Sequence, residues 1–302
     1  MASTYGYAPK TNLVSKYWKD KYEKDADKFW NKFYKSNKTN FFKDRHWLFR
    51  EFYELAPSEL LLHSDVVNNE VPAKTTVQDN VVPVIQSTEN PKSSTITKVK
   101  VMEVGCGVGN TVFPLLEGNP DLFIYAFDFA PTAVQLVKEN ANYKTDSVCA
   151  FVCDIVKQEL PPFVEDNSLD FIILIFVLSA ISPENMPNVL KKLHRALKPG
   201  GKLLFRDYAV NDMAQQRFEE ERRDKEPNKL QDNFYVRGDG TRAYYFSVEF
   251  LGEMCTSIGF DVDQNDYVHR DQENKKQELE LNRVFLQGKF VKKVDSNQNT
   301  TQ

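Results

Sequence analysis

The sequence predicts an α/β fold, in which a mostly parallel sheet of seven strands carries helices on both faces. Short apolar runs alternate with helical patterns between residues 99 and 291, which is typical of parallel strands joined by helices. A glycine-rich turn follows the first apolar run, and Lys198-Pro199-Gly200-Gly201 ends the helix before the fifth strand. These observations place residues 99–292 in one domain built around a single sheet.

The expected elements follow one another along the chain. Strands are expected over residues 99–104, 122–127, 148–153, 169–178 and 202–208, with two closing strands over 262–269 and 283–290. Helices are expected over residues 111–117, 131–140, 184–197 and 247–257. Pro114 is compatible with the first helix because it falls in the first turn, where its missing N–H has no helical partner.

Residues 1–65 form a separate N-terminal region that is rich in aromatic and basic side chains. Trp18 and Tyr22 belong to a helical stripe, and the simplest interpretation of such a stripe is core packing. Residues 66–98 have no period, and we expect a flexible linker or surface insertion there. The polar residues 293–302 are expected to form a disordered tail.

The composition describes a globular chain whose N-terminal region is locally basic. Hydrophobic residues make up 41% of the 302 residues, which is enough for a sizeable core, and the net charge is -4. Residues 1–50 nevertheless contain 12 Lys and Arg against 5 Asp and Glu. Such a run is typical of a solvated helix face, but it also suits a surface that attracts a polyanion such as RNA.

The chain shows no signal for a membrane or for secretion. Residues 1–10 contain no apolar segment of the kind that signal peptides need, and the longest apolar stretch, residues 171–181, is too short to cross a bilayer. The four cysteines lack the C-x-x-C pairing of metal ligands and suit reduced thiols. We therefore expect no membrane association, no metal site and a location in the cytoplasm or nucleus.

Three acidic residues are expected at the carboxyl ends of strands, where open α/β sheets bind their ligands. Glu103 begins the turn of residues 103–110, in which Gly105 and two further glycines recur at every second position. Asp128 and Asp154 end the second and third strands. An acid about twenty residues after such a turn accepts hydrogen bonds from ribose hydroxyls. Asp154 is placed to accept one from an adenine amino group, so we expect an adenosine-bearing ligand.

The glycine spacing favours S-adenosylmethionine as this ligand. A dinucleotide site has the pattern G-x-G-x-x-G, with a helix N-terminus facing a pyrophosphate. S-adenosylmethionine has no phosphate and carries cationic sulfonium and ammonium groups, which suit a turn that begins with Glu103. The spacing resembles the first motif of the class I Rossmann-like methyltransferases. A structural turn in another α/β protein and a nucleotide-dependent oxidoreductase are the alternatives.

Residues 29–35 and 40–47 combine aromatic rings with cations. Proteins that hold an extruded RNA base use this combination, because rings stack on the base and cations hold the phosphates. Packing inside a core is the simpler interpretation for rings at helical spacing. The mixture in residues 40–47 favours a helical RNA-binding segment.

Long strings of the chain resemble the tRNA N3-methylcytidine methyltransferases, which modify a cytidine in the anticodon loop. The matching strings are residues 29–35, 40–47, 103–110, 175–181, 204–208 and 233–242. Residues 274–276 and 283–290 resemble the branch that is specialised for serine tRNA. Two features depart from the family pattern: Ala209 stands where the family has glycine, and the segment 66–98 is longer.

The resemblance implies roles for the residues at matching positions. The cofactor would be enclosed by Trp30, Tyr34, Gly105, Asp128, Asp154 and Ile175. The target base would face two catalytic groups, Arg45 and Asp207. Further contacts with the RNA would come from Phe41 as a stacking platform and from Lys43, Arg206 and Arg237. The simpler alternatives are a surface phosphate contact for Arg45 and a cap or ion pair for Asp207.

The implied reaction forms N3-methylcytidine at position 32 of serine tRNA, by in-line methyl transfer to a flipped base. The sequence shows no Ser-His or Cys-His arrangement, in keeping with a transfer that needs no covalent nucleophile. The resemblance also implies seryl-tRNA synthetase as a partner, and we expect a monomer. Threonine or other tRNA, a protein or a small molecule as substrate, and a non-catalytic RNA-binding relative, are the alternatives.

Overall fold

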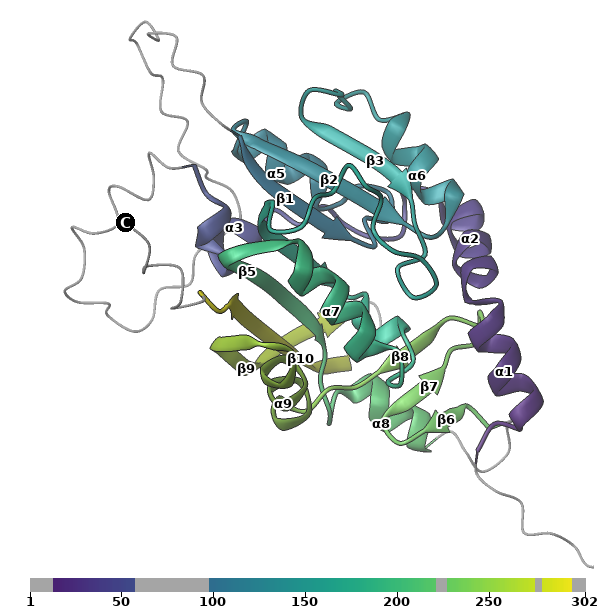
Figure 1. Cartoon of the computed structure of the whole chain (residues 1–302). Coiled ribbons are helices and arrows are strands. Elements are labelled where there is room, and N and C mark those ends of the chain that lie inside the picture. Colours follow the sequence, from purple (N-terminus) through teal and green to yellow (C-terminus); the bar gives the residue numbers. More distant parts are fainter. Residues whose placement is uncertain (1–12, 58–97, 221–226, 275–278, 295–302) are drawn as a thin grey trace, which may run out of the picture.

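A seven-stranded sheet forms the centre of the computed structural model, which describes residues 13–57, 98–220, 227–274 and 279–294 (Figure 1). Its strand order is β3-β2-β1-β4-β5-β10-β9. The strands are β1 (Val99–Val104), β2 (Leu122–Asp128), β3 (Val148–Val152), β4 (Leu169–Ile175), β5 (Leu197–Tyr208), β9 (Phe260–Asn274) and β10 (Leu279–Lys292). The first five strands in this order run parallel, whereas β10 is antiparallel to both β5 and β9. The mostly parallel sheet that the sequence predicts is confirmed.

Helices cover both faces of the sheet, because successive side chains of a strand point to opposite faces. In β1, Met102 belongs to one buried cluster and Val101 to another. The helices that supply the first cluster are α7 (Met186–Ala196) and α9 (Val248–Ile258). The helices that supply the second are α5 (Val112–Gly118), α6 (Pro131–Lys138) and α3 (Leu48–Glu51). No helix in the described ranges is long and apolar enough to cross a membrane.

Strand β5 begins earlier than the sequence predicts. Lys198-Pro199-Gly200-Gly201 does end helix α7, at Ala196, but the chain then continues directly as part of β5. Leu197 pairs with Leu169 of β4, and the register shifts before Phe171 pairs with Lys202. Gly200 has a φ of 79° within this irregular stretch, a conformation that glycine adopts without strain. The segment that ends helix α7 is therefore also the first, irregular part of strand β5.

Strands β9 and β10 are longer than expected, because they continue past the sheet as a two-stranded ribbon. Strand β5 pairs with β10 only from Phe285 to Val291, whereas β9 pairs with β10 from Leu279 onward. A strand shows alternating apolar and polar residues only where one face of its sheet packs against the core. Residues 270–274, which lengthen β9, contain no apolar side chain and so show no such pattern.

A second, three-stranded antiparallel sheet has no counterpart among the predicted elements. It consists of β6 (Lys229–Gln231), β7 (Phe234–Val236) and β8 (Arg242–Tyr244), and helix α8 (Met213–Glu220) precedes it. Residues 233–242, one of the strings that resemble the tRNA methyltransferases, form most of the β7–β8 hairpin of this sheet. Tyr235 is buried in it against Phe218 of α8.

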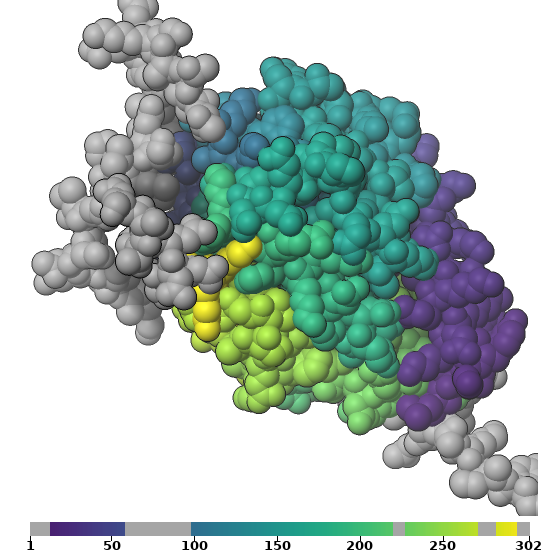
Figure 2. Space-filling view, viewed as in Figure 1, coloured from purple at the N-terminus to yellow at the C-terminus, as the bar shows by residue number. Residues whose placement is uncertain are grey.

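The N-terminal region has its first two helices along one side of the domain, at the right of Figure 1 and purple in Figure 2, whereas its third helix, α3, lies at the left of Figure 1. It contains α1 (Lys16–Lys24), α2 (Ala26–Asn37), α3 and the short 3₁₀ helix η1 (Tyr53–Leu55). Val14 donates a backbone hydrogen bond to Lys229 of β6, and Thr132 of α6 donates one to the Asn31 side chain of α2. The remainder of the expected N-terminal region, nearly all of the linker 66–98 and nearly all of the tail 293–302 lie outside the described residues.

Candidate functional site: two cavities that share a wall

The glycine turn between β1 and α5 places backbone where a side chain would not fit. Gly105, Gly107 and Gly109 have φ values of 65°, 53° and 93°, in the left-handed region. A Cβ on Gly105 would lie 2.6 Å from Val177, and one on Gly107 would lie 3.1 Å from the hydroxyl of Tyr34. The turn therefore presents bare backbone to neighbouring residues of the site.

Asp128 fixes this turn from the end of β2. Its carboxylate accepts hydrogen bonds from the backbone N–H groups of Gly107 at 3.0 Å and Ala130 at 2.9 Å. Burial raises the pKa of Asp128 to about 6, although these hydrogen bonds favour the charged form. The group is therefore ionised at neutral pH, and a carboxylate has lone pairs left to accept ligand hydroxyls.

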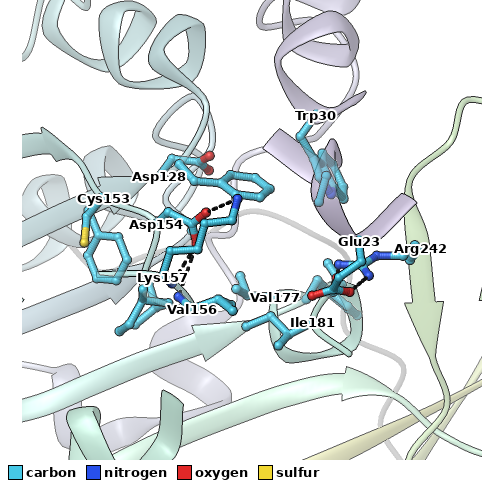
Figure 3. Close-up of a pocket in the computed structure, with 18 of the residues that line it drawn as sticks. Glu23, Trp30, Asp128, Cys153, Asp154, Val156, Lys157, Val177, Ile181 and Arg242 are labelled. Atoms are coloured by element: carbon cyan, nitrogen blue, oxygen red, sulfur yellow. Dashed lines mark hydrogen bonds and ion pairs between the residues drawn. The ribbon is translucent and has the colours of Figure 1, made fainter. Parts of the chain in front are cut away.

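The first cavity opens beside the turn and encloses about 750 Å³, with the solvent space at its mouth included. Its size lies within the range of small-molecule sites. Strand ends supply Val104, Gly105, Phe127, Asp128, Cys153, Asp154, Phe176 and Val177, and the N-terminal helices supply Glu23, Ala26, Trp30 and Tyr34. Figure 3 shows Trp30 extending from its helix on the opposite side of the cavity from Asp154 and Lys157.

Asp154 lines this cavity. The sequence predicts that it ends strand β3, but the strand ends earlier, at Val152. Asp154 lies two residues beyond the strand, where its carboxylate accepts a hydrogen bond from the N–H of Val156 at 3.1 Å. The same carboxylate forms an ion pair with Lys157 at 2.9 Å (Figure 3). One oxygen of the Asp154 carboxylate is therefore paired with the ammonium group of Lys157 at the wall of the cavity.

The cavity is closed at one end by an ion pair between distant segments. Glu23 of α1 binds Arg242 of β8, and Ser182 and Asn185 also donate to the Glu23 carboxylate (Figure 3). Burial alone would raise the pKa of Glu23, but the charge of Arg242 and the hydrogen bonds from Ser182 and Arg242 outweigh it and hold the pKa below its ordinary value. The N-terminal region thus provides part of the cavity wall.

A second cavity of about 530 Å³ adjoins the first. Residues that line both are Trp30, Tyr34, Gly105, Phe176, Ala180 and Arg242. Residues that line only the second are Phe42, Arg45, Cys106, Gly107, Asn110, Ile175, Ser179, Tyr208 and Arg237. Three arginines face this space, and no carboxylate is among the described residues that line it.

Arg45 is held in the second cavity by several contacts. Its guanidinium donates to the Thr111 hydroxyl at 2.8 Å, lies 3.6 Å from the Glu103 carboxylate and sits over the Phe176 ring at 5.8 Å. Burial raises the pKa of Glu103 to about 7, against the charge of Arg45. The Oε2 atom of Glu103 is buried without a hydrogen-bond partner among the described residues. Glu103 itself lines neither cavity, so it acts on them through Arg45.

Asp207 lies beneath the second cavity rather than on its surface. Its carboxylate is fully buried and accepts from the backbone N–H groups of Ser179 and Tyr208, both at 2.9 Å. Those two residues line the cavity. Burial raises the pKa of Asp207 to about 6. Ser179 lies in the first turn of the 3₁₀ helix Leu178–Ala180, so the carboxylate caps that turn, as one of the simpler alternatives expected, and it forms no ion pair with Arg206 among the described residues.

The structure does not bring three of the predicted RNA contacts into either cavity. Arg206 points to the opposite face of β5 from Asp207, where it donates to Gln287 and sits over Trp47 at 4.7 Å. The prediction of a substrate contact for Arg206 is therefore wrong for these cavities, because neighbouring strand residues alternate in direction. Phe41 is 58% exposed, lines neither cavity and packs on the rings of Phe33 and Phe42, of which Phe42 lines the second cavity. Lys43 lines an outer groove beside the glycine turn.

Sequence reasoning missed several residues that line the cavities. Glu23 and Phe176 were given no role, and Tyr208 was considered only as part of a matching string. Arg242 ends the matching string 233–242, but it too was given no role. Nothing local marks Glu23, because its partner Arg242 lies 219 residues away. Tyr208 follows Asp207 at the end of a predicted strand, which was a usable signal.

The fold and the first cavity define the class of protein, an S-adenosylmethionine-dependent methyltransferase. A family model described as a methyltransferase domain matches residues 102–203. The fold is also that of a SAM-dependent methyltransferase crystal structure from Methanosarcina mazei, with a TM-score of 0.52 and 17% sequence identity over 66% of this chain and 94% of that one. The cofactor would be held in the first cavity by Gly105, Asp128, Asp154 and Trp30. When bound there, S-adenosylmethionine would supply an activated methyl group.

Sequence relatives identify the family within this class. The tRNA N(3)-cytidine methyltransferase METTL6 of Homo sapiens is 42% identical over 280 residues, which cover 93% of this chain and 85% of that protein. METTL2 of Xenopus tropicalis is 44% identical over 276 residues, which cover 90% of this chain and 80% of that protein. The chain belongs to the tRNA N(3)-cytidine methyltransferases. It is therefore an enzyme that acts on tRNA with S-adenosylmethionine as cofactor, as the sequence predicted.

Proposed function

We propose that the enzyme methylates N3 of cytidine 32 in the anticodon loop of serine tRNA, with the base turned into the second cavity. The observation that carries this proposal is the wall that the two cavities share. A base in the second cavity would lie next to a cofactor in the first. Holding two reacting groups in this way supplies on the order of 7–11 kcal/mol of a barrier.

The lining of the second cavity matches the chemistry of the target base. N3 of cytosine lies on the Watson–Crick edge, so the base has to be unpaired and extruded, and extrusion costs least in a loop. Aromatic rings stack on an extruded base, and arginines donate hydrogen bonds to its carbonyl and to phosphates. Arg45 and Arg237 supply the donors, and Phe42, Phe176 and Tyr208 supply the rings.

Serine tRNA is favoured by residues 274–276 and 283–290, which resemble the serine branch of the family. Overall sequence identity does not decide which branch of the family the chain belongs to, since METTL6 of Homo sapiens is 42% identical and METTL2 of Xenopus tropicalis 44% identical. A synthetase that presents its tRNA would add specificity without any new contact at the base. We propose seryl-tRNA synthetase as this partner.

Purified enzyme should form N3-methylcytidine in serine tRNA, and the rate should rise at least about tenfold when seryl-tRNA synthetase is added. The reason is that a bound partner raises the effective concentration of the tRNA at the enzyme. Nucleoside mass spectrometry of the isolated anticodon loop measures the product and its position. Threonine tRNA with its own synthetase is the matched control. Faster methylation of threonine tRNA, or a product outside position 32, would contradict the proposal.

Reversal of three exposed lysines should weaken tRNA binding at least about tenfold. Lys32, Lys35 and Lys43 lie on the N-terminal region, and neutralising a phosphate contact lowers both affinity and its dependence on salt. Filter binding of the Lys32→Glu, Lys35→Glu, Lys43→Glu variant across a salt series measures both effects. The matched control reverses Lys138, Lys144 and Lys191, which are also exposed and change the net charge equally. Equal weakening in both variants would restore the interpretation of a solvated helix face.

A further inference from the structure

Phe176 has a backbone conformation that aromatic residues rarely adopt. It follows the last residue of β4 with a φ of 58°, in the left-handed region that disfavours any side chain with a Cβ. Its N–H donates to the backbone carbonyl of Arg206 at 2.8 Å, which holds the turn against the neighbouring strand. A strained residue retained by its surroundings points to a functional constraint at that position.

The left-handed turn changes the direction in which the side chains point. In a regular strand, neighbouring side chains alternate between the two faces of a sheet. Here three consecutive residues all line the site: Ile175 the second cavity, Phe176 both cavities and Val177 the first. A strand that continued without the turn could not place all three there. The turn thus places the Phe176 side chain on the wall that the two cavities share.

The Phe176 ring is supported by other residues of the site. The Tyr208 ring lies 5.1 Å from it at an interplanar angle of 39°, and Phe285 meets it edge-on at 5.5 Å. The guanidinium of Arg45 lies 5.8 Å from the ring centroid. Phe176 nevertheless remains only half-buried, and its uncovered part faces the cavities.

We infer that Phe176 is the aromatic surface on which the target cytosine stacks, and that its left-handed backbone serves to aim the ring at this wall. This inference rests on the proposed entry of the base into the second cavity. It transfers to Phe176 the stacking role that the sequence suggested for Phe41, which lies outside both cavities. Phe176 is then a residue that orients N3 of the base toward the cofactor cavity.

Replacing Phe176 by leucine should lower kcat/KM for tRNA at least about tenfold, because stacking of a base on an aromatic side chain contributes substantially to binding. Phe176→Tyr keeps the ring and should retain at least about half of the activity. Because Phe176 also lines the first cavity, the affinity for S-adenosylmethionine, measured by calorimetry, should fall in Phe176→Leu, but by less than half of the fold-change in kcat/KM. Phe163→Leu is the matched control, since Phe163 is an exposed aromatic residue outside both cavities, and it should behave like the wild type.

Phe176→Gly separates the backbone from the ring. Glycine adopts a φ of 58° without strain, so this variant should melt no lower than Phe176→Leu while losing at least as much activity. Wild-type kinetics in Phe176→Leu would overturn the inference, and so would a loss of cofactor affinity as large as the loss of kcat/KM. Failure of the wild type to modify cytidine 32 of serine tRNA would instead refute the proposed function.

Discussion

Asp128→Ala should weaken S-adenosylmethionine binding at least about a hundredfold. Two charge-assisted hydrogen bonds from ribose hydroxyls, each worth about 1.5–3 kcal/mol, would be lost. The substitution also removes the acceptor of the Gly107 and Ala130 N–H groups, which leaves the glycine turn without its anchor. Isothermal titration calorimetry of the purified protein measures the change. An affinity within about threefold of the wild type would contradict the role assigned to this carboxylate.

The pH dependence of the same binding gives an independent readout. The pKa of Asp128 is about 6, so the carboxylate gains a proton and loses its charge as the pH falls through 6. Cofactor affinity should therefore be constant above about pH 7 and decline below pH 6. Asp128→Asn should bind weakly with a flatter profile. Asp146→Asn, at an exposed aspartate before β3, is the matched control and should keep the wild-type profile.

Asp207→Asn should lower kcat at least about tenfold while leaving the cofactor affinity within about twofold of the wild type. The methylated base becomes cationic before it loses a proton, and a buried carboxylate stabilises such a charge because no solvent screens it. Asparagine can accept only one of the two hydrogen bonds from Ser179 and Tyr208, so the cavity lining would also shift. Single-turnover methylation at saturating tRNA measures the rate.

The pH dependence of the rate tests whether Asp207 acts through its negative charge or only through its shape. Its pKa of about 6 means that it is ionised above this value and neutral below it. At saturating cofactor, the rate of the wild type should fall as the pH drops through 6, whereas the rate of Asp207→Asn should not show this step. A variant that is slow but keeps the step would assign Asp207 a purely structural role.

The sequence predicts the sheet and the cofactor turn well, because both have local signals. Apolar runs and the glycine spacing place β1, β2 and β4 to within a few residues. The three-stranded sheet was missed because strands of three residues are too short to show a period. Arg206 was misplaced because a matching string says nothing of direction, although strand alternation separates it from Asp207.

The shared wall of the cavities was beyond the reach of sequence analysis for two physical reasons. The φ of Phe176 contradicts its residue type, so no propensity indicates it. Glu23 and Trp30 reach the first cavity only through tertiary contacts of α1 and α2 with residues far along the chain. The resemblance to a known family supplied Trp30 and Tyr34, but it supplied nothing for Glu23.

The ion pair between Glu23 and Arg242 has a consequence for the order in which the protein is made. Helix α1 has no buried residue of its own, and its ionic partner is synthesised 219 residues after it. Until β8 has left the ribosome, Glu23 can meet Ser182 and Asn185 but not Arg242, and contacts this distant in sequence form late in folding. The cofactor cavity is therefore completed among the last steps. A partly synthesised chain would carry the glycine turn without the enclosure that retains the cofactor.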